Sequence, residues 1–190
     1  MGDTAEYIVL CEDLQAQTFV YRALRRSGVG VRQIRKLPLP SKTEGGAGDA
    51  FVVAKYAAEV KSFRARAAAK GLVVHIDADM NSVASRHARL ADALREAGQK
   101  ARGKTEPIAE LVPKRNIETW IYALDTSLAA RLDRSLDEET DYRKLSGHQR
   151  DCATAAAALA DGAKRGTLPE SPTATPSLAD GLQEFGRVLP

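Results

Sequence analysis

The stretch LVVHIDAD, residues 72–79, decides the fold that this sequence predicts. Its first five residues, Leu72–Ile76, form a short and almost continuous apolar run, which is typical of a strand buried on both faces of a parallel sheet. Asp77 and Asp79 follow directly, so the strand leads into a D-x-D motif. The sequence thus predicts a central strand that presents two carboxylates at its C-terminal end.

Outward from this strand, strand and helix patterns alternate along the chain. Strands are predicted at Tyr7–Cys11, Val29–Leu37, Leu72–Ile76 and Ile108–Val112, and helices at Leu14–Arg26, Phe51–Lys70, Ser82–Ala97 and Ile117–Leu124. Such alternation favours an α/β fold with a parallel four-stranded sheet and helices on both faces. Further helices are predicted near Ala153–Arg165 and Ser177–Arg187, after a loop at Pro38–Asp49 and beside a linker at Thr167–Pro176. We therefore expect an α/β domain at residues 1–125 and a helical C-terminal extension at residues 126–190.

Composition sets limits on the class of protein. The 190 residues are 44% hydrophobic, which suffices for a core, and the net charge of +3 excludes a simple polycation. No apolar run approaches the roughly 18–20 residues that a membrane span needs. The start MGDTAEYIVL lacks the features of a secretory signal, and Cys11 and Cys152 imply no disulfide framework. These observations predict a cytoplasmic protein that does not enter a membrane.

A third acid is predicted to join the D-x-D motif. Glu12 follows the first strand, and the carboxyl ends of parallel strands lie at one edge of a sheet, where sites commonly form. Carboxylates brought together there repel each other unless a proton or a cation neutralises them. Glu12, Asp77 and Asp79 are therefore predicted to bind Mg²⁺ or Mn²⁺. The simpler alternative is that each acid caps a helix.

The segment PKRNIETW, residues 113–120, follows the fourth strand. Here Glu118 is a candidate fourth acid, and Lys114 or Arg115 could stabilise negative charge on a phosphoryl group. The alternative is that Arg115 and Glu118 form a salt bridge while Trp120 packs in the core. His75 is predicted to be a buried core residue.

Three segments together resemble one known family: YIVLCEDLQAQTFVYRAL, LVVHIDADMNSVASR and PKRNIETWIYAL. They are similar to the Toprim domain of topoisomerases, primases and nucleases, and within it to the overcoming-lysogenization-defect (OLD) and RloB-type branch linked to anti-phage defence. The resemblance implies a Toprim-like sheet and a metal-dependent nuclease with Glu12, Asp77 and Asp79 as metal ligands. It also implies Glu118 as a further site acid.

Two features of the chain bear on that resemblance. The family usually has glycine where Asp13 stands, and a second glutamate in the region that Gln15–Gln17 occupies, so binding of a second metal is open. OLD-type nucleases often work with an ATPase, and this sequence has no G-x-x-x-x-G-K-[ST] motif of its own. The resemblance therefore implies a separately encoded ATPase partner, and homo-oligomerisation is left open.

Basic residues supply the candidate nucleic-acid contacts. Arg25, Arg26, Arg32, Arg35 and Lys36 come from a run without acidic residues, and Lys114 adds a sixth. They are predicted to contact phosphates of DNA or RNA beside the metal site. A solvated protein surface is the alternative.

Three functions remain open from the sequence. The first is Mg²⁺-dependent nuclease activity on DNA or RNA, with Glu12, Asp77, Asp79, Glu118 and Arg115 as catalytic residues. The second is a non-catalytic subunit that binds nucleic acid or a protein partner. The third is a phosphatase or nucleotidyl transferase that uses D-x-D, which ranks last because the motif follows a later strand than in aspartyl-phosphate phosphatases.

Overall fold

The computed structural model describes residues 6–40, 48–132, 135–143, 152–167 and 175–190. Its strands are β1 Tyr7–Cys11, β2 Ile34–Lys36, β3 Gly71–His75 and β4 Ile108–Leu111. Its α-helices are α1 Leu14–Arg26, α2 Gly48–Arg64, α3 Val83–Glu96, α4 Ile117–Leu124, α5 Thr126–Ala129, α6 Ala153–Arg165 and α7 Pro176–Gly186. The predicted loop Pro38–Asp49 and linker Thr167–Pro176 lie largely outside the described residues.

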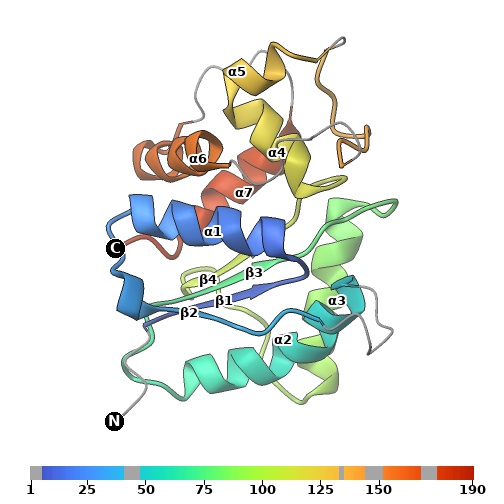
Figure 1. The fold of residues 1–190 in the computed structure, drawn as a ribbon. Coiled ribbons are helices and arrows are strands. Elements are labelled where there is room, and N and C mark those ends of the chain that lie inside the picture. Colours follow the sequence, from blue (N-terminus) through green and yellow to red (C-terminus); the bar gives the residue numbers. More distant parts are fainter. Residues whose placement is uncertain (1–5, 41–47, 133–134, 144–151, 168–174) are drawn as a thin grey trace.

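The four strands form one parallel sheet in the order β2-β1-β3-β4. The two central strands pair from Tyr7 with Gly71 to Cys11 with His75, so β1 and β3 end at the same level. Helices cover both faces of the sheet, with α1 and the C-terminal helices on one side and α2 and α3 on the other (Figure 1). The predicted α/β fold with a four-stranded parallel sheet is confirmed.

The second strand is shorter than predicted. Residues Val31–Gln33 form a 3₁₀ helix, and pairing with β1 begins only at Ile34. The Gly30 N–H donates to the Gln33 side-chain oxygen at 2.6 Å, and the Gln33 N–H donates to the Gly30 carbonyl at 3.0 Å. These two bonds close a turn, so the chain cannot extend from residue 29.

The helix α2 ends at Arg64, six residues earlier than predicted. Beyond it the chain turns, and the Lys70 N–H donates to the Glu6 carbonyl at 2.7 Å. Gly71, which follows the predicted helix, opens β3, where a Cβ atom would lie 2.9 Å from Cδ1 of Tyr7. Tertiary packing at the start of the sheet therefore overrides the helical pattern of residues 65–70.

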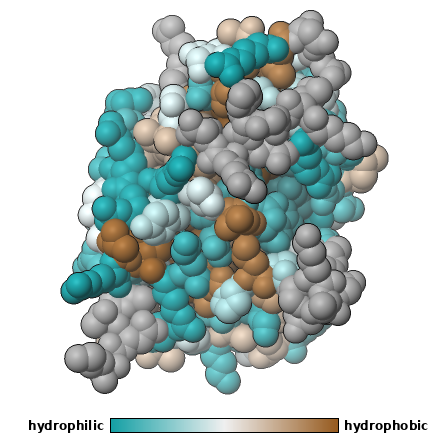
Figure 2. Space-filling model, in the orientation of Figure 1, coloured by the Kyte–Doolittle hydropathy of each residue, from teal (hydrophilic) through white to brown (hydrophobic). Residues whose placement is uncertain are grey.

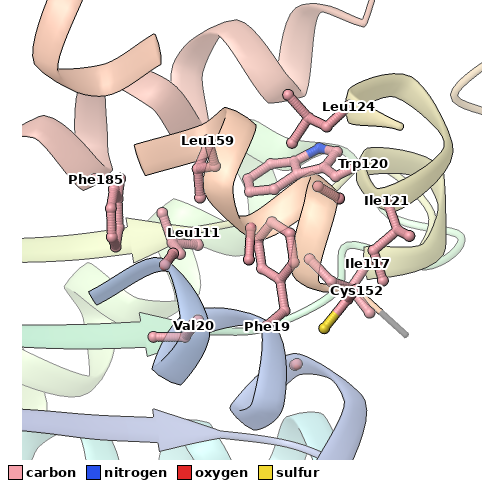
Figure 3. Close-up of a cluster of buried hydrophobic side chains, with 14 of the residues drawn as sticks. Phe19, Val20, Leu111, Ile117, Trp120, Ile121, Leu124, Cys152, Leu159 and Phe185 are labelled. Atoms are coloured by element: carbon pink, nitrogen blue, oxygen red, sulfur yellow. The ribbon is translucent and has the colours of Figure 1, made fainter. Parts of the chain in front are cut away.

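Each face of the sheet has its own hydrophobic core. The core under α2 and α3 contains Ile8, Leu10, Val74 and Ile76. The other core joins α1 and the sheet to the C-terminal helices; it includes Phe19, Leu111, Trp120, Leu159 and Phe185, which meet in Figure 3. Trp120 is fully buried, as the sequence alternative for this residue stated. The C-terminal extension thus shares a core with the sheet.

The surface has no large apolar region on the face that Figure 2 shows: hydrophilic residues predominate, and apolar ones form small separate patches. Large exposed apolar side chains on described residues are Leu14, Val31 and Met80. No α-helix in the described ranges combines the length and the apolar character that a bilayer span requires.

Candidate metal centre at the carboxyl edge of the sheet

The topology brings the predicted acids to one place. Glu12 follows β1 directly, and Asp77 lies two residues beyond β3, which is the neighbour of β1. Two further backbone bonds, from Ile76 N–H to the Leu111 carbonyl and from Ala78 N–H to the Pro113 carbonyl, hold the segment around Asp77 against the end of β4. The carboxylates therefore stand on ordered backbone at the carboxyl edge of the sheet.

Three side chains converge at this edge. The backbone N–H of Asp77 donates to Oε1 of Glu12 at 3.2 Å, and Nε2 of His75 lies 3.5 Å from Oδ1 of Asp77. One ligand atom from each of Glu12, His75 and Asp77 lies within 4.8 Å of the others. This spacing allows the three atoms to share one metal ion.

His75 was not among the predicted ligands. It is fully buried, as the prediction of a core residue requires, but its ring belongs to this group. The signal was present in the sequence: alternate residues of a strand point to the same face, so His75 and Asp77 lie on the same side of β3. The group that could hold a metal thus contains His75 where Asp79 was expected.

Asp79 lies beside the group and has another partner. Its backbone is left-handed, with φ of 55°, which is uncommon for a residue other than glycine. Its Oδ1 atom lies 3.3 Å from Nη2 of Arg143, which also pairs with Asp141. The charge of Asp79 still contributes to raising the pKa of Glu12, so the two carboxylates are near each other.

Glu118 approaches the same edge from α4. The helix starts at Asn116, whose side-chain oxygen accepts from the Thr119 N–H, and this cap fixes the first turn that carries Glu118. Glu118 is 5% exposed, and its Oε2 atom has no hydrogen-bond partner on the residues that the structure describes. Its charge contributes to the raised pKa of Asp77.

Arg115 lies half-buried immediately before α4. Its Nη1 atom contacts Sδ of Met80, the residue that follows Asp79. Within the described ranges, no ion pair joins Arg115 to Glu118, so the alternative of a first-turn salt bridge is wrong. The guanidinium thus reaches the loop that carries the second aspartate of the D-x-D motif.

The first turn of α2 closes the other side of the site. A Cβ atom at Gly48 would lie 2.9 Å from Cβ of Glu12 and 3.0 Å from its carbonyl oxygen. This close approach is open only to glycine without a shift of the backbone. Burial of the Glu12 side chain is therefore a result of packing between α2 and the end of β1.

Burial dominates the electrostatics of these groups. It raises the pKa of Glu12 to about 7, and burial together with the charge of Glu12 raises the pKa of Asp77 well above its usual range. Burial also raises the pKa of Glu118 to about 7 and lowers the pKa of His75 to about 4. Without a cation the acids retain protons near neutral pH, whereas His75 is neutral and keeps a ring nitrogen available as a ligand.

The chemistry of the donor set fits a metal ion. Oδ1 of Asp77 and both ring nitrogens of His75 are buried and have no hydrogen-bond partner among the described residues. Orphaned buried polar atoms are uncommon in native structures, and an ion that is not part of the structure is one standard explanation for them. A divalent cation would therefore supply the partner that these buried atoms lack among the described residues.

The predicted nucleic-acid contacts are spread over the molecule. Arg25 and Arg26 lie in the last turn of α1, and the 13 residues of this helix span about 20 Å, so both are remote from Glu12 at its start. Arg26 forms an ion pair with Asp161 at 2.8 Å, and Arg25 donates to the Val29 carbonyl at 2.7 Å.

The remaining basic residues lie in two regions. Arg32 is in the 3₁₀ helix, and Arg35 and Lys36 are on the edge strand β2. Lys36 sits over the ring of Tyr21, 5.0 Å from its centroid. Lys114 follows β4 at the carboxyl edge and pairs with Glu139 at 2.9 Å. The structure thus brings Lys114 to the edge that carries the acids, and it places Arg25 and Arg26 elsewhere.

No family model, curated protein or solved structure matches this chain. What stands is an α/β domain with a four-stranded parallel sheet and a buried group of Glu12, His75 and Asp77. The Toprim likeness therefore stays a prediction, carried by the quoted motifs and their order along the chain.

Proposed function

We propose that this protein is a metal-dependent hydrolase of phosphodiester bonds in DNA or RNA. The observation that carries the proposal is the buried group of Glu12, His75 and Asp77 at the carboxyl ends of two neighbouring parallel strands. Burial makes these groups unfavourable without a cation, and strongly perturbed acids in a site are a mark of function rather than of stability. The Toprim-like motifs supply the substrate class.

The ligand set guides the choice of ion. Carboxylates alone suit Mg²⁺, the ion expected from Glu12, Asp77 and Asp79. An imidazole nitrogen from His75 shifts the preference toward first-row transition ions, and among these Mn²⁺ also favours carboxylate oxygen. Mn²⁺ is therefore the first ion to test, with Mg²⁺ beside it.

The reaction is hydrolysis: a P–O bond forms from a water oxygen, and the P–O bond to the leaving sugar oxygen breaks. A divalent ion held by Glu12, His75 and Asp77 would supply Lewis-acid stabilisation of the phosphate and a more acidic water. Glu118, with its unpartnered oxygen and a pKa of about 7, accepts the proton from the water and can return one to the leaving oxygen. Arg115 adds positive charge beside the phosphate.

A role in anti-phage defence and a separately encoded ATPase partner belong to this proposal through the family likeness alone. A direct check is co-purification of the chain with an ATPase, followed by comparison of cleavage with and without ATP. Stimulation by ATP supports the partner, and equal cleavage under both conditions speaks against it.

The second candidate is a subunit that binds metal and nucleic acid without turnover. It is favoured by the ion pair between Asp79 and Arg143, since one oxygen of this predicted ligand then has another partner. It is also favoured by Gln17, which lies in the region where the family has a second acid and donates to the Leu37 carbonyl at 2.8 Å. A chain with one metal would then bind its target but leave cleavage to another subunit.

The test is incubation of supercoiled plasmid, single-stranded DNA and RNA with the protein and Mn²⁺ or Mg²⁺. We expect cleavage that Asp77→Asn lowers at least about 100-fold, because even the loss of a group that only hydrogen-bonds to a metal ligand costs about 10- to 100-fold. Asp92→Asn on the exposed side of α3 is the matched control. Cleavage that survives Asp77→Asn contradicts the proposal, and Mn²⁺ binding without any cleavage supports the second candidate.

A further inference from the structure

A cavity of about 360 Å³ opens at the outer edge of β4, away from the acids described above. Its polar lining comes from His87 on α3, Arg102 before β4, Glu110 on β4, and Asp180, Gln183 and Glu184 on α7. Its apolar wall is formed by alanine and leucine side chains of α3 and the segment that follows. A volume of this size is in the range of small-molecule sites.

Glu110 is the unusual residue of this cavity, because it is a carboxylate in the middle of a strand and only 5% exposed. Tyr56 donates its hydroxyl to Oε1 at 2.5 Å, and Nδ1 of His87 lies 2.7 Å from Oε2. Burial opposes the charge of Glu110, but the hydrogen bonds from His87 and Tyr56 and the charge of Arg102 outweigh it, so its pKa is lowered. Glu110 is therefore ionised.

The ionised carboxylate fixes the tautomer of His87. Since Glu110 has no proton to give, Nδ1 of His87 must be the donor in their bond. The other ring nitrogen, Nε2, is then an acceptor in the neutral ring, and no described residue donates to it. His87 is 30% exposed and lines the cavity, so this acceptor is available to a ligand.

On the side of the cavity formed by α7, the polar groups next to the sheet already have hydrogen-bond partners. Glu184 binds Arg102 through an ion pair and accepts from the backbone N–H of Glu110 at 2.9 Å. Arg102 also donates to the Ile108 carbonyl at 2.8 Å. These bonds cover the outer edge of β4 and fix α7 there, and His87 takes no part in them. Docking of α7 therefore does not explain the pairing of His87 with Glu110.

The charges around the cavity do not balance. Asp180 and Glu184 are four residues apart and so share one face of α7. The carboxylates are Glu110, Asp180 and Glu184, and the guanidinium groups that face them are Arg102 and Arg187, which pairs with Glu184. With His87 neutral, one negative charge remains, and Asp180 is the exposed carboxylate of the lining.

We propose that this cavity binds a small organic monocation with hydrogen-bond donors and a short apolar portion, such as an alkylguanidinium or alkylammonium. Its donors reach Nε2 of His87 and the carboxylate of Asp180, and its apolar portion lies on the wall formed by Ala91 and Leu94. An anion meets uncompensated carboxylates here, and a neutral molecule leaves the net charge unmatched. The site is separate from the metal centre and does not depend on the proposed nuclease activity.

The probe for the test is butylguanidinium, and its matched control is butylurea, which has a similar shape without the charge. Binding is followed by the ring signals of His87 in NMR spectra, assigned by comparison with His87→Gln among the chain's three histidines. We expect a saturable shift of the His87 signals with butylguanidinium and none with butylurea. Asp180→Asn lowers the affinity at least about 10-fold, because it removes a charge-assisted hydrogen bond.

Two further variants complete the test. Asp77→Asn, which alters the metal centre, leaves binding of butylguanidinium unchanged, and Asp92→Asn controls for loss of an acid elsewhere. Equal binding of butylurea, or equal affinity in Asp180→Asn, overturns the proposal. So does the lack of any saturable shift up to about 10 mM probe, which corresponds to less than about 3 kcal/mol of binding free energy.

Discussion

Replacing Asp77 by asparagine is expected to stabilise the metal-free protein. Asn keeps the shape of a protonated aspartate but cannot ionise, so the variant lacks a carboxyl whose pKa burial and the charge of Glu12 raise well above its usual range. Acids whose pKa is raised on folding contribute stability below about pH 4.5, and this stability is lost as the pH rises through about 7. In the wild type, the rise of the Glu12 pKa from 4.5 to about 7 corresponds to about 3 kcal/mol lost by pH 8.

The variant avoids a loss of the same kind at residue 77. The unfolded wild type gains free energy by ionising Asp77, whereas burial opposes this ionisation in the folded state, so we expect a gain of about 2 kcal/mol for Asp77→Asn at about pH 8 in EDTA. For a chain of 190 residues this raises the melting temperature by roughly 4–8 °C. At about pH 5 the difference is expected to shrink, because the unfolded wild type then gains less free energy by ionising Asp77.

The assay is thermal unfolding at both pH values, with EDTA and with Mn²⁺. In the wild type, Mn²⁺ raises the melting temperature according to its affinity for the folded state, whereas in Asp77→Asn it has little effect. Asp92→Asn serves as the control for a general change in charge. A lower melting temperature of Asp77→Asn in EDTA at pH 8, or equal stabilisation by Mn²⁺, would refute the reasoning.

Three further outcomes follow from other parts of the molecule. Glu118→Gln is expected to lower cleavage about 100-fold or more while Mn²⁺ affinity measured by calorimetry stays within a few-fold, because a general base contributes about 10²–10⁴. Gly181→Ala is expected to destabilise the protein by about 1–3 kcal/mol or more in urea unfolding, because its Cβ would overlap the ring of Trp120. Lys114→Ala is expected to weaken DNA binding in gel-shift titrations more than Arg26→Ala, since only the former residue lies at the carboxyl edge.

The fold was predictable because its signals are local. Helices at Leu14–Arg26, Ile117–Leu124 and Ala153–Arg165 have the bounds that their periodicity and flanking residues indicate. The bounds of β2 and α2 were predicted wrongly because contacts that local patterns do not show determine where these elements begin and end. The apolar pattern of residues 29–37 carries no sign of the turn that Gly30 and Gln33 close, and the helical pattern before Gly71 gives no sign of Tyr7 beside it.

The sequence predicted the place of the site and two of its three members, Glu12 and Asp77. Parallel topology brings Glu12 to Asp77, and the order of strands and motifs along the chain predicted that topology. Strand alternation would have added His75 to the group, because residues 75 and 77 point to the same side. The apolar residues around His75 instead indicated a core position. The pairing of Asp79 with Arg143 joins residues 64 positions apart, and local sequence patterns do not encode such a contact.

The central claim is that Glu12, His75 and Asp77 together bind one divalent ion. Crystals grown with Mn²⁺ and measured at its absorption edge test this directly. The account predicts one anomalous peak bonded to an oxygen of Glu12, a nitrogen of His75 and an oxygen of Asp77. A peak elsewhere with these three side chains unliganded, or no peak at saturating Mn²⁺, would contradict it.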